Sequence, residues 1–167
     1  MPRRNKDGTY TCREVIVKYG KPAKVMDRVS NSMIAADLFR EIIEDHSRES
    51  FMAVYLSAKN APLGWRTIAV GGVATCTVDA IPMLQGAMLV GASAIVVGHN
   101  HPSGETDPSP QDIALTGKIE EVCDAVGYRL LDHVIVSHSD KNKHSSIRDL
   151  GLWPKKSSAD DKLDCHT

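Results

Sequence analysis

The sequence predicts a three-layer α/β domain built around a mixed β-sheet. Short β-branched segments alternate along the chain with segments of helical periodicity, and neither an internal repeat nor a second domain is visible. A length of 167 residues corresponds to one ordinary domain. Its 42% of hydrophobic residues suffices for a packed core, which places the chain among globular proteins.

The first half of the chain predicts a basic segment, one helix and several strands. Residues 1–29 carry eight basic and three acidic side chains and contain a candidate first strand at 13–19. A solvated basic face is favoured there over a nucleic-acid contact. Apolar positions at helical spacing predict an amphipathic helix from an N-cap at Ser32 to about His46. A turn is predicted at 59–64, and strands at 51–56, 66–70 and 74–78.

The second half predicts two helices and two strands around a central loop. We expect a buried apolar helix at 82–91, in which Gly86 allows a close approach, then a strand at 94–98. A helix at 110–126 ends before Gly127, with a predicted core stripe of Leu115, Ile119, Val122 and Val126. The remaining segments are a strand at 128–137, a polar loop at 138–145, a short element at 147–153 and a disordered polar tail at 154–167.

The stretch HNHPSGETDPSPQD at 99–112 carries the chemistry. His99 and His101 end the buried strand two residues apart, so their imidazoles share one face. Ser109 is expected at the N-cap of the next helix, with Pro110 at its first position, and the loop returns Asp112 toward the histidines. Alone, Ser109 and Asp112 are ordinary helix caps. Together, two imidazoles and one carboxylate predict a catalytic zinc site.

Composition weighs against several other classes of protein. A net charge of -1 gives no general attraction to nucleic acid or to a membrane. The cysteines lack C-x-x-C spacing, which favours reduced thiols over a disulfide framework; they are Cys12, Cys76, Cys123 and Cys165. The apolar stretch around 87–97 is too short to span a bilayer, and no apolar signal segment follows the basic N-terminus. We therefore expect a cytoplasmic protein with no membrane partner.

The pattern H-x-H-x7-S-x2-D, here His99, His101, Ser109 and Asp112, resembles the motif of the JAMM (MPN+/JAB) metallohydrolases. Glu49, between the first helix and the next strand, stands where that family has an upstream glutamate. HNHPSG at 99–104, Pro108-Ser109, Thr116 and LDHVIV at 131–136 resemble the RadC-like bacterial branch more narrowly, over about residues 30–153. The resemblance implies a catalytic domain there, with the three-layer α-β-α JAB/MPN (cytidine-deaminase-like) fold.

The resemblance also implies a zinc-dependent hydrolase of peptidase or isopeptidase type. His99, His101 and Asp112 would bind Zn²⁺. Glu49 would act as general base on the zinc-activated water, and Ser109 would help hold the oxyanion. A peptide or protein substrate, and pairing of two copies of the chain, are expected with this function.

Two other functions stay open on the sequence. A RadC-like protein of DNA repair or of mobile elements would act on nucleic acid, although acidic Glu105, Asp107 and Asp112 argue against phosphate binding. A non-catalytic binding module would use the fold without turnover. A structural zinc site would need a fourth protein ligand, for which Cys76 and His133 are candidates.

Other positions qualify the resemblance. Asp132 and His133 are adjacent in a predicted strand, where a satisfied sheet histidine is favoured over a residue that orients a metal ligand. Ile81-Pro82 replaces an Arg-Glu pair of many family members, and Leu56-Ser57 replaces Leu-Asp. RadC-like proteins usually begin with a helix-hairpin-helix region, for which this chain has no room. None of these departures touches the predicted ligands.

Overall fold

The computed structural model describes residues 6, 19–20, 28–71 and 79–154, and every structural statement below refers to them. Along the chain the elements are α1 (Ser32–Ile42), β1 (Ser50–Leu56), β2 (Pro62–Val70), α2 (Ala80–Leu89), β3 (Ala94–Asn100), α3 (Pro110–Ala125), β4 (Arg129–Val136) and β5 (His144–Ser146). Outside the described residues lie the predicted strand at 74–78, most of the one at 13–19, nearly all of the tail, and Cys12, Cys76 and Cys165.

One mixed sheet forms the middle layer, with the strand order β2-β1-β3-β4-β5. β1 is antiparallel to both of its neighbours, whereas β3 and β4 are parallel and are joined by α3. β5 closes the far edge antiparallel to β4. The carboxyl ends of β3 and β4 and the amino end of β1 therefore meet at the same edge of the sheet. This architecture confirms the predicted α/β class.

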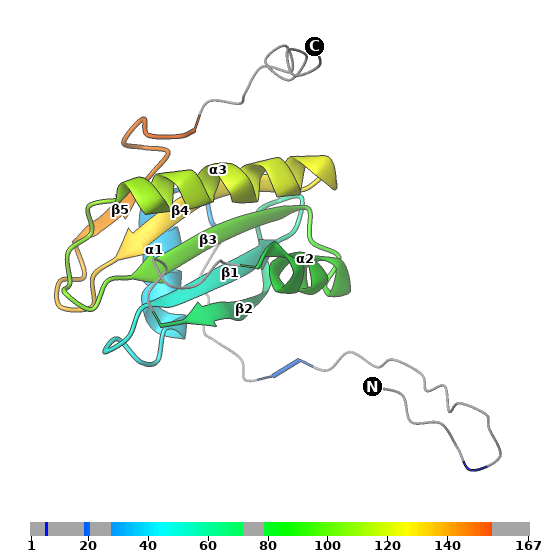
Figure 1. The fold of residues 1–167 in the computed structure, drawn as a ribbon, viewed down its shortest axis with the longest axis horizontal. Coiled ribbons are helices and arrows are strands. Elements are labelled where there is room, and N and C mark those ends of the chain that lie inside the picture. Colours follow the sequence, from blue (N-terminus) through cyan, green and yellow to red (C-terminus); the bar gives the residue numbers. More distant parts are fainter. Residues whose placement is uncertain (1–5, 7–18, 21–27, 72–78, 155–167) are drawn as a thin grey trace, which may run out of the picture.

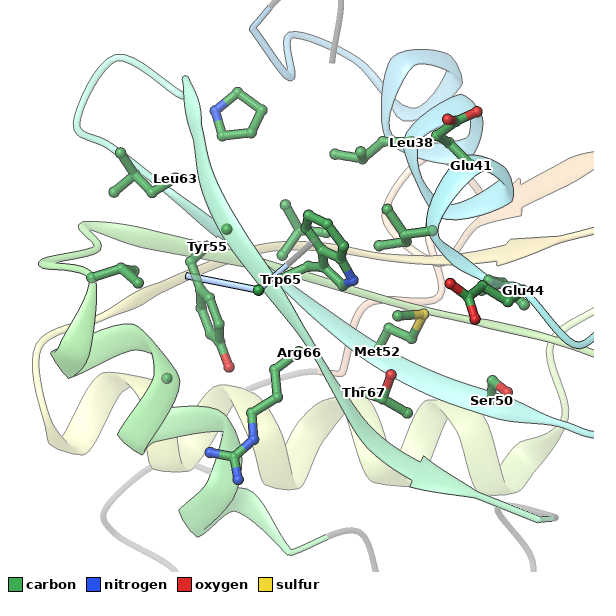
Figure 2. A pocket seen from close by; sticks show the side chains of 18 of the residues that line it. Leu38, Glu41, Glu44, Ser50, Met52, Tyr55, Leu63, Trp65, Arg66 and Thr67 are labelled. Carbon is green, nitrogen blue, oxygen red and sulfur yellow. The ribbon is translucent and has the colours of Figure 1, made fainter. Parts of the chain in front are cut away.

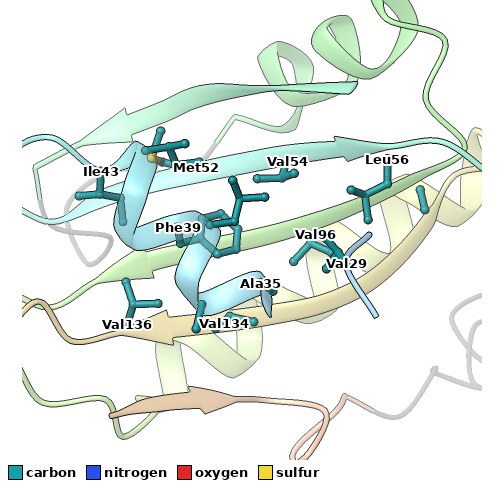
Figure 3. Close-up of a cluster of buried hydrophobic side chains, with 14 residues drawn as sticks. Val29, Ala35, Phe39, Ile43, Met52, Val54, Leu56, Val96, Val134 and Val136 are labelled. Atoms are coloured by element: carbon teal, nitrogen blue, oxygen red, sulfur yellow. The ribbon is translucent and has the colours of Figure 1, made fainter. Parts of the chain in front are cut away.

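Helices cover both faces of the sheet, α1 on one face and α2 and α3 on the other (Figure 1). Alternate strand residues face the two layers, because successive side chains in a strand point to opposite sides. Phe39 of α1 packs over Val54, Val96 and Val134 (Figure 3). Gly98 lies beneath Phe39, where an added Cβ would stand 2.6 Å from the ring. A second cluster fills the opposite face; it includes Phe51, Tyr55, Met83, Val97, Ile119 and Cys123.

The helices differ from the prediction in their ends and in their buried faces. Asn31 rather than Ser32 caps α1, since its side chain accepts the Ile34 N–H at 2.9 Å, and the helix ends at Ile42. α2 starts at Ala80 behind an Asp79 cap. The prediction of a buried α2 is only partly right: Gly86 packs against the ring of Tyr55 as expected, whereas its outer face exposes Ile81, Met88 and Leu89.

The inward stripe of α3 was also predicted incompletely. Ile119 is buried, but Val126 is 46% exposed, and the remaining fully buried positions are Asp112, Thr116 and Cys123. Two of these are polar because the first half of α3 faces other polar groups at the edge of the sheet. β2 begins at Pro62, inside the predicted turn, and β5 begins in the predicted polar loop and ends one residue beyond it. A strand of three polar residues has no apolar alternation that would reveal it.

In the described part of the chain, no helix combines the length and the apolar character needed to cross a membrane.

Candidate metal centre

The edge where β1, β3 and β4 meet brings the four principal predicted site residues together. Glu49 directly precedes β1, His99 lies in β3, His101 follows that strand, and Asp112 lies in the first turn of α3. One potential ligand atom from each of the four lies within 4.8 Å of all the others. His99 and Asp112 are buried, whereas Glu49 and His101 are partly exposed. The cluster therefore has a closed side within the sheet and an open side toward solvent.

The start of α3 fixes the position of the Asp112 carboxylate. Ser109 is the N-cap, its Oγ accepts the Asp112 N–H at 3.2 Å, and Pro110 occupies the first turn. Asp112 Oδ2 in return accepts the Ser109 N–H at 2.8 Å and the Ser109 hydroxyl at 2.6 Å. This capping box leaves Oδ1 facing His99. Asp112 can therefore complete the helix cap through Oδ2 and offer Oδ1 to a metal at the same time.

The distances among the candidate ligand atoms suit a small tetrahedral cation. The Nε2 atoms of His99 and His101 are 3.0 Å apart. Asp112 Oδ1 lies 3.3 Å from His99 Nε2, and Asp112 Oδ2 lies 3.8 Å from His101 Nε2. Tetrahedral zinc with ligands at about 2.0–2.1 Å separates neighbouring ligand atoms by about 3.3–3.4 Å. The spacing of these three side chains is therefore close to that of three ligands of a tetrahedral zinc, with a different Asp112 oxygen nearest to each imidazole.

The backbone at Glu105 sets the orientation of His101. His101 Nδ1 lies 2.9 Å from the carbonyl oxygen of Glu105. Because a carbonyl oxygen only accepts hydrogen bonds, Nδ1 carries the hydrogen in this contact. In the neutral ring, Nε2 then presents a lone pair toward His99 and Asp112. Histidine ligands to metals typically have this arrangement, in which one ring nitrogen donates a hydrogen bond and the other faces the metal.

Electrostatics favour the ionisation states that a metal requires in His99 and Asp112, but favour the protonated form of His101. Burial, reinforced by His133, lowers the pKa of His99 well below its usual range, so this imidazole is neutral at pH 7. Burial acts to raise the pKa of Asp112, but His101, His99 and Ser109 together outweigh it and hold that pKa well below its usual range. The Asp112 carboxylate in turn raises the pKa of His101. A cation between these groups would displace a proton chiefly from His101.

Asn100, between the two histidines, holds the segment that carries Glu49. Because it points to the opposite face of β3, its Oδ1 accepts the Ser50 N–H at 3.0 Å. Its Nδ2 donates to the Arg48 carbonyl at 3.0 Å, so both neighbours of Glu49 are bonded to one buried side chain. The Glu49 carbonyl also accepts the Gly71 N–H at 2.8 Å. In the sequence, only the position of Asn100 between the two histidines indicates a role for it.

His133 contacts His99 on the side of the imidazole that faces away from the candidate metal centre. Its Nε2 is 2.9 Å from His99 Nδ1, and its Nδ1 is 2.7 Å from Thr116 Oγ1. Burial lowers the pKa of His133 to about 4. His133 therefore contacts a candidate ligand rather than joining the group as a fourth ligand, and the other such candidate, Cys76, lies outside the described residues.

Two other acidic residues near the site serve different partners. Asp132 turns away from His99, and its two carboxylate oxygens accept the His133 N–H at 2.8 Å and the Ser146 hydroxyl at 2.6 Å. It therefore holds β5 against β4. Glu105 pairs with Lys143 at 2.7 Å, an exposed contact that lowers the pKa of Glu105.

A cavity of about 1050 Å³ runs between the end of α1 and the edge strand β2. Figure 2 shows Trp65, Met52 and Leu38 within it, with Glu41 and Glu44 on the α1 side. Its lining reaches Arg48 and Ser50, the two neighbours of Glu49. The cavity therefore reaches the segment around Glu49, but none of the four residues of the candidate metal centre lines it.

Comparison with known proteins places these residues in a family. The sequence pattern of the RadC-like JAB domain matches residues 29–152. A UPF0758 protein of Coprothermobacter proteolyticus is 38% identical over 113 residues, which cover 68% of this chain and 47% of that protein. A UPF0758 protein of Aquifex aeolicus is 36% identical over 108 residues, 65% of this chain and 46% of the relative.

A UPF0758 protein of Actinobacillus pleuropneumoniae serotype 5b is 33% identical over 129 residues, which cover 77% of this chain and 59% of the relative. The chain therefore spans about half the length of the curated relatives it matches, and their names state no activity. The matched region runs from before α1 to beyond β5 and contains Glu49, His99, His101 and Asp112. This chain belongs to the RadC-like JAB domain family.

Proposed function

We propose that this domain is a zinc-dependent hydrolase of the JAMM type, which cleaves an amide bond in a peptide or an isopeptide. One observation carries the proposal: the Nε2 atoms of His99 and His101 and the Asp112 carboxylate converge within 3.0–3.8 Å, with Glu49 in the same group. Two imidazoles and a carboxylate leave room for water, as in catalytic zinc sites. Membership of the JAB family supports the same function.

Each residue has a role in this mechanism. Zinc held by His99, His101 and Asp112 would act as a Lewis acid and lower the pKa of water to about 7. Glu49 takes a proton from the attacking water and returns it to the leaving amine. Asn100 keeps Glu49 in place through its two backbone contacts. Ser109 holds the Asp112 carboxylate through its hydroxyl, and its further action on the oxyanion stays a prediction.

The surroundings of the site favour a peptide over a nucleic acid as substrate. The cavity beside β2 is lined by apolar groups, and its three carboxylates outnumber its two guanidinium groups; these charged residues are Glu41, Glu44, Asp45, Arg48 and Arg66. Carboxylates repel phosphates, whereas an extended peptide contributes apolar side chains and backbone hydrogen bonds. A peptide bound along the edge strand β2 would pass Arg48 and Ser50, the two neighbours of Glu49.

Metal content and turnover test the proposal together. We expect about one zinc per purified chain in the wild type, as in a mononuclear catalytic site, and loss of that zinc in His101→Ala. His138→Ala removes an exposed histidine outside the group and serves as the matched control. Glu49→Gln should retain zinc but lose hydrolysis of peptide and isopeptide substrates. A wild-type protein that takes up no zinc on titration would overturn the hydrolase proposal, and full turnover by Glu49→Gln would overturn the role of Glu49.

A further inference from the structure

A continuous hydrogen-bonded chain of buried groups leads from the candidate metal centre back to the backbone of α3. His99 Nδ1 lies 2.9 Å from His133 Nε2, and His133 Nδ1 lies 2.7 Å from Thr116 Oγ1. Thr116 Oγ1 in turn lies 2.7 Å from the carbonyl oxygen of Asp112. The side chains of His99, His133 and Thr116 each have 0% exposure, so solvent does not compete for these hydrogen bonds.

The Asp112 carbonyl, at the end of this series of hydrogen bonds, sets the direction of all the others. A carbonyl oxygen has no hydrogen to donate, so the Thr116 hydroxyl must donate to Asp112. The only hydroxyl hydrogen is then in use, and Thr116 Oγ1 accepts a hydrogen from His133 Nδ1. A fully buried imidazole is favoured in its neutral form, which has a single N–H. His133 Nε2 is therefore the acceptor in its contact with His99.

We propose that Thr116 and His133 are positioning residues that fix the tautomer of His99, so that its Nδ1 carries the hydrogen and its bare Nε2 faces the metal. This inference rests on the proposed zinc function, because Thr116 and His133 would act on the ligand His99 and not on the metal itself. His101 reaches the same tautomer through its bond to the Glu105 carbonyl. Once His101 is neutral, both Nε2 atoms, 3.0 Å apart, offer lone pairs that a cation between them could accept.

The position of Thr116 explains why this chain of contacts is tied to the site. Thr116 lies four residues after Asp112 on α3, so both side chains occupy the same face of the helix. Asp112 then contributes its carboxylate to the metal group and its carbonyl to the end of the hydrogen-bonded chain. A shift in the first turn of α3 would move both. The first turn of α3 therefore fixes both the position of the Asp112 carboxylate and the tautomer of His99.

Thr116→Val and Thr116→Ser form a matched pair for the test. Valine keeps the shape of threonine but removes the hydroxyl, which frees His133 to carry its hydrogen on Nε2 and to force the His99 hydrogen into the metal position. We expect Thr116→Val to weaken zinc binding by about 10–100-fold in competition with a chelator. Serine restores the hydroxyl, and Thr116→Ser should bind zinc as tightly as the wild type. Equal zinc affinity in Thr116→Val and the wild type would overturn the proposal.

The tautomers provide a readout that does not depend on zinc or on a variant. In the metal-free wild type, two-bond ¹⁵N–¹H correlation spectra should show His133 with its hydrogen on Nδ1 and a bare Nε2. A hydrogen on His133 Nε2 would contradict the proposal even if zinc binds. If the wild type binds no zinc, the hydrolase proposal fails, while the His133 tautomer still decides whether this hydrogen-bonded chain runs in the stated direction.

Discussion

Asn100→Ala removes the side chain that supports both neighbours of Glu49, and its effect follows from the contacts. The Ser50 N–H loses its acceptor at 3.0 Å in a residue that is only 7% exposed. An orphaned buried donor costs about 1–3 kcal/mol, and loss of the bond to the Arg48 carbonyl costs about 1 kcal/mol more. We therefore expect the free energy of unfolding to fall by about 2–4 kcal/mol, which lowers Tm by roughly 5–15 °C in a domain of this size.

The effect on function should differ from the effect of losing a ligand. Asn100 lies on the face of β3 opposite the histidines, so Asn100→Ala should retain zinc while turnover falls, because Glu49 is no longer held in place. Urea unfolding, zinc content and hydrolysis are measured on the same preparation. Asn142→Ala, at an exposed loop residue, is the control. Unchanged stability, or loss of zinc in parallel with activity, would refute the proposal that Asn100 holds Glu49 in place.

Two further changes test the packing and the electrostatics. Gly98→Ala places a Cβ 2.6 Å from the Phe39 ring, and we expect it to destabilise the fold by about 1–3 kcal/mol in denaturant unfolding; an unchanged midpoint would contradict the packing of α1. Zinc affinity should fall as pH falls, because the raised pKa of His101 lets a proton compete for Nε2. For one displaced proton the fall approaches about tenfold per pH unit below that pKa, and an affinity that is flat from pH 8 to pH 5 would refute this.

The polar half of α3 explains why its buried face was predicted only in part. Helical periodicity was applied to apolar residues, which identified Ile119 but also selected Val126, an exposed residue at the C-cap. Asp112 and Thr116 are buried because they have partners on β3 and β4. A buried polar stripe becomes visible only once those partners are known, since polar residues on a helix usually face solvent.

The sequence alone determined the local features of this protein. The apolar run of β3, the two histidines on one face and the capping box of Ser109 and Asp112 depend on neighbours within a few residues, and the structure confirms them. Likewise, the alternation of strands and helices was enough for the α/β class. Such features are readable because strand period and helix capping act over short distances along the chain.

Apart from Glu49, which the family resemblance already indicated, only the tertiary structure decided which distant residues surround the site. Antiparallel pairing of Phe51 with His99 brings Glu49 to the histidines, and parallel pairing of Val97 with His133 places His133 behind His99. The hydrogen-bonded chain through Thr116 and the support of Glu49 by Asn100 follow from that register. Register depends on how whole faces of strands and helices pack together, and a shift of one residue would turn each side chain to the other face of the sheet.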